Sequence, residues 1–196
     1  MHSKAEAKTA WESFGRVDCV LEKMLALKTE VLVIICRNAA GDTAFFRSAK
    51  TIIAQAFWPT PSCPRAFRLS IASRAQEYAE KIAHALDYVG VLCVELFVLD
   101  GDKLIANELA PRPHNSGHAT IEACSTSQYE QQVRAMAGLP LGDTTQIAPA
   151  VMLNILGDLW FDADDQPTTP PWTELLKMPG VKLHLYGKAQ ARRARK

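Results

Sequence analysis

The sequence lacks the features that would place it in a membrane or a secretory pathway. Its most apolar stretches are residues 31–36 and 89–99, the second of which contains Glu95, whereas about 20 apolar residues are needed to span a bilayer. The first twenty residues carry charged side chains throughout and no apolar core of a signal peptide. From these absences we expect a cytoplasmic protein with neither a membrane-spanning segment nor a secretory signal.

Cysteine pairs and an excess of charge of one sign are also missing. The five cysteines are odd in number, widely spaced and without a Cys-x-x-Cys pair, so we expect reduced core residues rather than metal ligands. The 22 basic and 21 acidic residues nearly cancel, which argues against binding of nucleic acid or an anionic membrane through overall charge. With 196 residues, 48% of them hydrophobic, the chain suits one globular domain and a small second lobe.

Hydrophobic patterning predicts an α+β fold with a mainly antiparallel sheet. β-Branched runs predict strands at residues 17–21, 31–37, 43–47, 151–156 and 181–185, and proline-rich loops are predicted at 58–64 and 162–171. Helical spacing predicts one helix from Ala75 to Leu86, capped by Ser73, and another from Ser127 to Ala137. Strands at 91–99 and 103–109, joined around Asp100-Gly101-Asp102, predict a hairpin.

Two glutamates in this hairpin form the first candidate site. Glu95 interrupts an apolar run, where a buried carboxylate is costly unless it is paired or binds a cation. If the hairpin closes through a four-residue loop, Glu95 faces Glu108 directly. Like charges at this distance repel, but they suit a hard divalent cation, and Asn107 adds another oxygen. Spacing alone leaves a second interpretation open, in which one glutamate points outward or pairs with a nearby lysine.

The loop after Glu108 favours the metal-site interpretation. Residues 107–118 are NELAPRPHNSGH, with two prolines, one glycine and a dense set of polar donors: Arg112, His114, Asn115, Ser116 and His118. Polar loops on rigid strands commonly hold ligands. We therefore predict one site formed by the glutamate pair and this loop.

The same stretch resembles the ATP-grasp superfamily, and within it the carboxyaminoimidazole ribonucleotide synthetase family of purine biosynthesis. Glu22, Lys23 and Glu30 resemble the hinge of that family, and residues 126–130 resemble the helix after its substrate loop. Residues 151–157 resemble the opening of its small carboxyl-terminal domain. The resemblance implies a carboxyl-terminal portion only: a partial ATP-grasp domain over residues 1–145 and a truncated, β-rich carboxyl-terminal domain over 146–196.

The resemblance implies an ATP-dependent ligase that carboxylates 5-aminoimidazole ribonucleotide with bicarbonate, giving ADP and phosphate. It implies ATP and Mg²⁺ (or Mn²⁺) as cofactors, a homodimer in the full-length family, and no nucleic acid or membrane as partner. Glu95 and Glu108 would hold the metal. Nucleotide contacts would come from Glu22, Lys23, Glu30 and Asn107. The catalytic residues would be Arg112, His114 and Asn115, and the substrate-binding residues would be Ser116, Gly117, Lys188, Arg192, Arg195 and Lys196.

Departures from the family pattern keep other hypotheses open. Thr51 and Ile53 stand where the family has polar, substrate-facing residues, which favours a non-catalytic remnant or nucleotide-binding module. A related formate-dependent glycinamide ribonucleotide transformylase is a further alternative, although Asn115-Ser116-Gly117 departs from the Asp-Thr-Gly character of its loop. The intact NELAPRPHNSGH loop favours a portion of a working synthetase that is active only together with the missing part.

Overall fold

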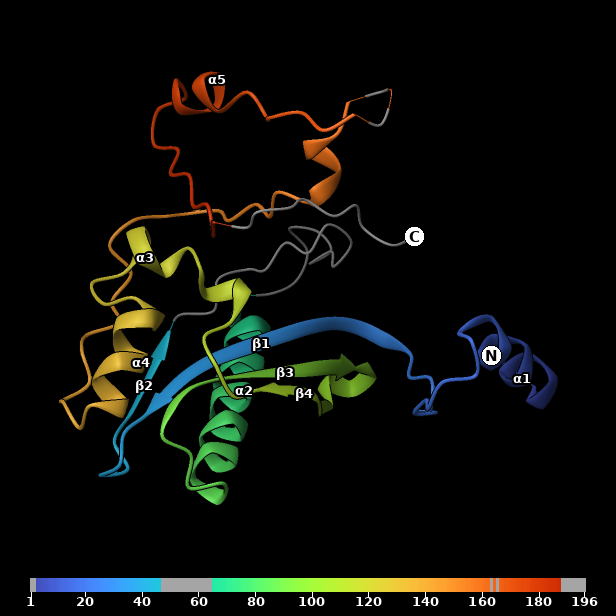
Figure 1. Cartoon of the computed structure of the whole chain (residues 1–196). Helices are drawn as coiled ribbons and strands as arrows, with labels where there is room; N and C mark the ends of the chain where they lie inside the picture. The colour runs from blue at the N-terminus through green and yellow to red at the C-terminus, as the bar shows by residue number, and fades with distance from the viewer. Residues whose placement is uncertain (1–2, 47–64, 163, 165, 188–196) are drawn as a thin grey trace. The chain divides into compact units, whose positions relative to one another are not determined.

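The first part of the chain is built around an antiparallel sheet (Figure 1). In this computed structural model, which describes residues 3–46, 65–162, 164 and 166–187, the strands are β1 (Leu27–Arg37), β2 (Thr43–Phe46), β3 (Gly90–Leu99) and β4 (Leu104–Ala110). Their order is β2-β1-β3-β4, and every neighbouring pair is antiparallel. The predicted strands at 31–37 and 43–47 and the predicted hairpin are therefore confirmed within the described residues.

One face of the sheet is covered by the long helix α2 (Arg65–Ala85), which crosses the strands (Figure 1). Ile71, Ala75, Ala79 and Ala83 recur every four residues and are buried. They pack on side chains from the central strands, including Val33, Ile35, Leu92 and Val94. Residues four apart lie on one side of a helix, and three alanines allow its axis to approach the sheet closely.

The opposite face is covered at one end by α4 (Gln128–Met136), which contributes the buried Ala135. Ala135 packs with Ile34, Cys36, Val91 and Cys93. The helix predicted from Ser127 to Ala137 is confirmed, and the Ser127 side chain caps it by accepting a hydrogen bond of 3.1 Å from the Glu130 N–H.

The helix predicted from Ala75 to Leu86 exists, but it begins earlier than expected. Ser73 lies inside α2 and is not its cap, because the turn before it already carries Ile71, a buried contact to the sheet. At the other end, the buried Arg37 donates to the Tyr88 carbonyl (3.0 Å) and to the Asp87 carboxylate (2.7 Å). These bonds fix the turn that leads from α2 into β3.

The chain divides into two units at Ala150 and Val151. In the described part of the second unit, through residue 187, no strand forms, and the predictions for residues 151–156 and 181–185 are wrong. The β-rich character expected of this segment is absent from the described residues, which contain an isolated bridge between Phe161 and Pro167. Val151 and Leu153 are 83% and 86% exposed, and a strand needs a paired neighbour and a covered face to persist.

The strand predicted at residues 17–21 is wrong for the same reason, since Val20 is exposed and no strand among the described residues pairs with this segment. The remaining helical segments are short: α1 (Lys4–Ser13), η1 (Asp100–Asp102), η2 (Asn115–Gly117), α3 (Thr120–Ala123), η3 (Gly157–Trp160) and α5 (Trp172–Leu176). Every helix in the described residues is too short or too polar to cross a bilayer. The predicted loop at 58–64 lies outside the described residues, as do Thr51 and Ile53.

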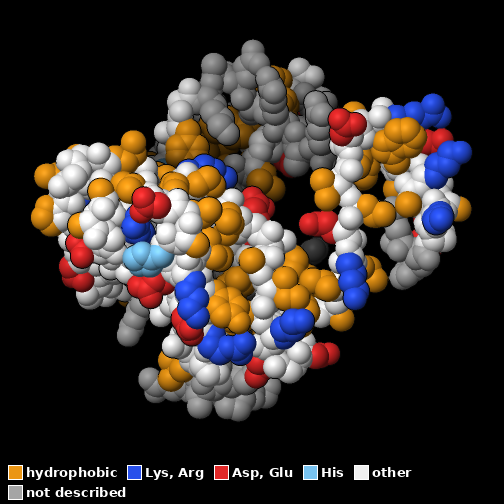
Figure 2. Space-filling view, turned by 90° about the horizontal axis from the view of Figure 1, so that it is seen from below, with side chains coloured by type: hydrophobic (Ala, Val, Ile, Leu, Met, Phe, Trp, Pro, Cys, Tyr) orange, Lys and Arg blue, Asp and Glu red, His pale blue; other side chains and the backbone are white. Residues whose placement is uncertain are grey.

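Charged side chains show no excess of one sign on the face seen in Figure 2. Lys and Arg side chains lie interspersed with Asp, Glu and hydrophobic ones. This mixture agrees with the formal net charge of +1.

Candidate metal and substrate site

Glu95 and Glu108 are direct partners across the β3–β4 ladder, as the sequence predicts. The route to this pairing differs from the prediction. Val98 pairs with Leu104, and the Leu99 N–H donates to the Lys103 carbonyl (2.9 Å), so the register beside the loop is one residue away from the predicted one. Asn107 is then an extra residue in β4, between the pairs Leu96–Ala106 and Glu95–Glu108. Such a bulge shifts the register by one position and brings the glutamates back into opposition.

A third glutamate lies on the same face of the sheet. Leu32 of β1 pairs with Glu95, and Glu30 pairs with Phe97, two positions further along. Because side chains alternate along a strand, Glu30, Leu32 and Glu95 share one face. Glu30 and Glu108 are exposed, and the Glu95 side chain is 25% exposed. The predicted metal ligands and one predicted nucleotide ligand therefore share an accessible acidic face.

His114 connects the polar loop to this pair. Its Nε2 atom lies 3.3 Å from Glu95 Oε1, and its Nδ1 atom accepts a hydrogen bond of 3.3 Å from the Ser116 N–H, which caps η2. A neutral imidazole has one donor and one acceptor nitrogen. Because Nδ1 accepts, the proton lies on Nε2 and points to the Glu95 carboxylate.

The backbone of His114 is held by Gln128 from α4, a residue for which the sequence predicted no role. The His114 N–H donates to Gln128 Oε1 (2.9 Å), and Gln128 Nε2 donates to the His114 carbonyl (2.6 Å). The Gln128 N–H in turn donates to Thr120 Oγ1 (3.0 Å). Gln128 is 0% exposed, and a buried amide needs such partners. Its signal in the sequence was a glutamine at the start of an amphipathic helix that follows the loop.

Cys93 completes a cluster with Glu95 and His114, in which one possible ligand atom from each residue lies within 4.8 Å of the others. The protonation states do not favour a thiolate metal site. Burial raises the pKa of Cys93 to about 12, so the sulfur carries a proton at neutral pH, and His114 presents a protonated Nε2. The ligands that remain available to a cation are the carboxylate oxygens of the glutamate pair.

The other loop residues predicted from the sequence lie in different environments. Arg112 and Asn115 are exposed, whereas Ser116 and Gly117 are buried. A Cβ atom at Gly117 would lie 2.5 Å from Gln128 Oε1 and 2.6 Å from Ile34 Cδ1, so this position has no room for a side chain. Gly117 therefore allows the loop to approach the sheet and α4.

The remaining predicted ligands fall into two groups. Glu22 and Lys23 are exposed in the segment before β1, outside strands and helices. Lys188, Arg192, Arg195 and Lys196 lie outside the described residues. The structure thus brings together Glu30, Glu95, Asn107, Glu108 and the loop at 112–117.

Comparison with known proteins matches two parts of the chain to family models. Residues 1–129 match the family model of the ATP-grasp domain. The chain belongs to the ATP-grasp family. Residues 150–196 of this ATP-grasp protein match a second model, the phosphoribosylaminoimidazole carboxylase C-terminal domain.

Two similar curated proteins carry the same name. The chain is 42% identical over 193 residues to N5-carboxyaminoimidazole ribonucleotide synthase of Brucella melitensis, covering 98% of this chain and 51% of that protein. It is 40% identical over 178 residues to the synthase of Bacillus subtilis, covering 91% and 45%. The chain thus spans about half the length of these relatives. The resemblance to the synthetase family is confirmed.

Solved structures with this fold include synthetases of similar name. The synthetase from Thermus thermophilus has a TM-score of 0.75 at 37% identity, over 99% of this chain and 51% of that one. The synthase from Aspergillus clavatus, in complex with ADP and 5-aminoimidazole ribonucleotide, has a TM-score of 0.74 at 31% identity, with the same coverage. The predicted partial ATP-grasp fold is therefore confirmed.

Proposed function

We propose that this ATP-grasp chain provides the metal-binding face and the substrate loop of a carboxyaminoimidazole ribonucleotide synthetase. The reaction is the ATP-dependent carboxylation of 5-aminoimidazole ribonucleotide with bicarbonate in purine biosynthesis. The observation that carries the proposal is the Glu95–Glu108 pair beside the His114 loop. The names of the relatives, and the ribonucleotide in the Aspergillus complex, support the same substrate. A cytoplasmic location and a homodimer belong to this proposal.

The donor set fits Mg²⁺ or Mn²⁺. Two carboxylates face each other across the hairpin, and Asn107 occupies the bulge beside them. Hard divalent cations bind through carboxylate and amide oxygens, and a cation removes the repulsion between two facing anions. When bound, the ion would neutralise charge on the phosphates of ATP during phosphoryl transfer.

In the proposed reaction, a bicarbonate oxygen attacks the γ-phosphorus of ATP, forming carboxyphosphate and releasing ADP. The amine nitrogen of the ribonucleotide then attacks the carboxyl carbon, the carbon–oxygen bond to phosphate breaks, and the nitrogen loses a proton. Arg112 and Asn115 would hold the bicarbonate and carboxyphosphate, because guanidinium and amide groups donate to anionic oxygens, and His114 would orient the Glu95 carboxylate beside them. Ser116 and Gly117 would contact the ribonucleotide.

The remaining predicted ligands serve the two nucleotides. Glu30 lies on the acidic face and, with Glu22, Lys23 and Asn107, would contact ATP. Lys188, Arg192, Arg195 and Lys196 would contact phosphate oxygens, for which the arginine fork is well suited. Their positions lie outside the described residues.

The test is ADP release by the purified chain with ATP, Mg²⁺, bicarbonate and 5-aminoimidazole ribonucleotide. We expect turnover that requires the ribonucleotide and disappears in the double variant Glu95→Ala, Glu108→Ala. A matched control, Glu77→Ala with Glu174→Ala, removes two exposed carboxylates that pair with lysines elsewhere and should retain activity. ATP turnover that does not depend on the ribonucleotide, or that survives in the first double variant, would contradict the proposal.

A further inference from the structure

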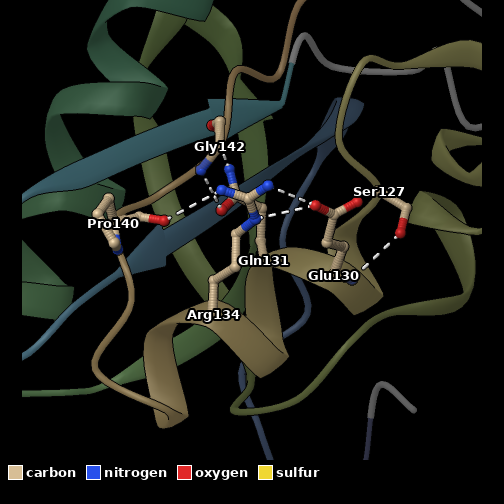
Figure 3. A network of polar contacts seen from close by, with 6 residues as sticks. All are labelled: Ser127, Glu130, Gln131, Arg134, Pro140 and Gly142. Carbon is tan, nitrogen blue, oxygen red and sulfur yellow. Dashed lines mark hydrogen bonds and ion pairs between the residues drawn. The ribbon is translucent and has the colours of Figure 1, made fainter.

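Helix α4 carries two fully buried glutamines that hold backbone segments in the same way. Gln128 and Gln131 are both 0% exposed. Gln131 Nε2 donates to the Gly142 carbonyl (2.6 Å), and the Gly142 N–H donates to Gln131 Oε1 (3.0 Å). Figure 3 shows this pair, with Arg134 beside it, bonded to Glu130 and to the Pro140 carbonyl. Gln128 makes the equivalent pair of bonds to His114, at 2.9 and 2.6 Å.

The two glutamines differ in what they hold. Gly142 has no side chain, and the segment around it carries none of the predicted ligands. His114 instead directs its imidazole to Glu95, with Nε2 3.3 Å from Oε1. Fixing both the N–H and the C=O of one residue fixes its backbone dihedral angles, and these restrict its side-chain rotamer.

We propose that Gln128 is a positioning residue: through the backbone of His114 it sets the direction of the imidazole and, through that ring, the Glu95 carboxylate. The role in metal binding rests on the proposed function. Groups that orient metal ligands from behind commonly change metal affinity 10- to 100-fold when they are replaced. Gln128 does not touch the reacting groups, and both hydrogen bonds of its side-chain amide go to the His114 backbone.

The matched variants Gln128→Met and Gln131→Met test this role. Methionine approximates the volume of glutamine and removes both hydrogen bonds, so each variant loses the same number of contacts from an equally buried site. The first readout is the tautomer of His114, from long-range proton–nitrogen NMR correlations assigned by their loss in His114→Gln. The second is the affinity for Mn²⁺ by titration calorimetry.

We expect the wild-type His114 to carry its proton on Nε2, to lose this preference in Gln128→Met, and to retain it in Gln131→Met. Mn²⁺ affinity should fall at least about tenfold in Gln128→Met only. Gln128→Asn, which keeps the amide but shortens the side chain by one methylene group, should fall between wild type and Gln128→Met and provides a second variant if Gln128→Met does not fold.

Equal tautomer ratios in Gln128→Met and Gln131→Met would overturn the positioning role, as would a wild-type proton on Nδ1. If the wild-type chain does not bind Mn²⁺, the proposed metal site fails. The tautomer comparison still decides the link from Gln128 to His114, so the two failures are distinguishable.

Discussion

The sheet face that carries Glu95 has two halves with opposite chemistry. In the covered half, Ile34, Cys36, Val91 and Cys93 are buried under α4. In the open half, Glu30 and Glu108 are exposed and Glu95 is partly exposed. Hydrophobic packing stabilises the covered half, whereas carboxylates that face each other do not stabilise the folded chain. The difference shows that the same two strands serve as core at one end and as a candidate binding surface at the other.

The largest expected effect comes from placing a carboxylate in the covered half. Val91 is 0% exposed, so Val91→Asp buries a charge without a partner and should lower the free energy of unfolding by about 3–5 kcal/mol. Urea denaturation followed by circular dichroism measures the change. Val133→Asp, at a position 64% exposed on α4, is the control and should change stability by less than about 0.5 kcal/mol. Similar losses in both variants would show that the two halves do not differ as described.

A smaller effect is expected at the contact between loop and helix. Gly117→Ala places a methyl group against Gln128 Oε1 and Ile34 Cδ1, and should destabilise the chain by about 1–3 kcal/mol. In a Gln128→Ala background the same substitution should destabilise less, because one obstacle is gone. Thermal unfolding of the four proteins gives this coupling. Additive losses would mean that Gly117 and Gln128 do not press on each other.

The covered half also predicts a dependence on alkaline pH. Burial raises the pKa of both Cys36 and Cys93 from 9.0 to about 12. A folded-state pKa above the unfolded value means that this stabilisation is complete below pH 9 and is lost as the pH rises toward about 12. Between about pH 8 and pH 10, each thiol should contribute a loss on the order of 1 kcal/mol. The same pH change in Cys36→Ala and Cys93→Ala should produce a smaller loss, and an equal loss would contradict the assignment.

The smallest expected effect is the release of repulsion in the open half. Without metal, Glu108→Gln should raise the free energy of unfolding by about 0.2–1 kcal/mol, because like charges directly opposite each other destabilise a strand pair. Chemical denaturation in the presence of a chelator measures this gain. Glu122→Gln, an exposed position outside the hairpin, is the control. A loss of stability in Glu108→Gln would mean that the pair is attractive without a cation.

Local signals in the sequence predicted the parts of the fold whose neighbours are close in the chain. The hairpin, the helix α4 and the Glu95–Glu108 pairing follow from such signals. The bulge at Asn107 did not, because periodicity does not reveal where an extra residue enters a ladder. The apolar run at residues 151–156 predicted a strand that does not form, because a strand depends on a partner that a local pattern does not contain.

Local sequence signals predicted the candidate site only in part as well. Glutamate spacing and the NELAPRPHNSGH loop indicated which residues carry the chemistry. The bond between His114 and Glu95, and the hold of Gln128 on His114, join residues 14 or more positions apart. Such contacts depend on how α4 packs on the sheet, and local sequence patterns do not specify that packing.

The most direct test of the central claim is the affinity of the chain for Mn²⁺, compared with Glu95→Gln and Glu108→Gln. Both variants keep the side-chain volume and remove one anionic ligand, and the Glu77→Gln control removes an exposed charge paired with Lys81. We expect each hairpin variant to weaken Mn²⁺ binding by at least about tenfold and Glu77→Gln to leave it unchanged. Wild-type affinity in both hairpin variants would contradict the assignment of the Glu95–Glu108 pair as a metal site.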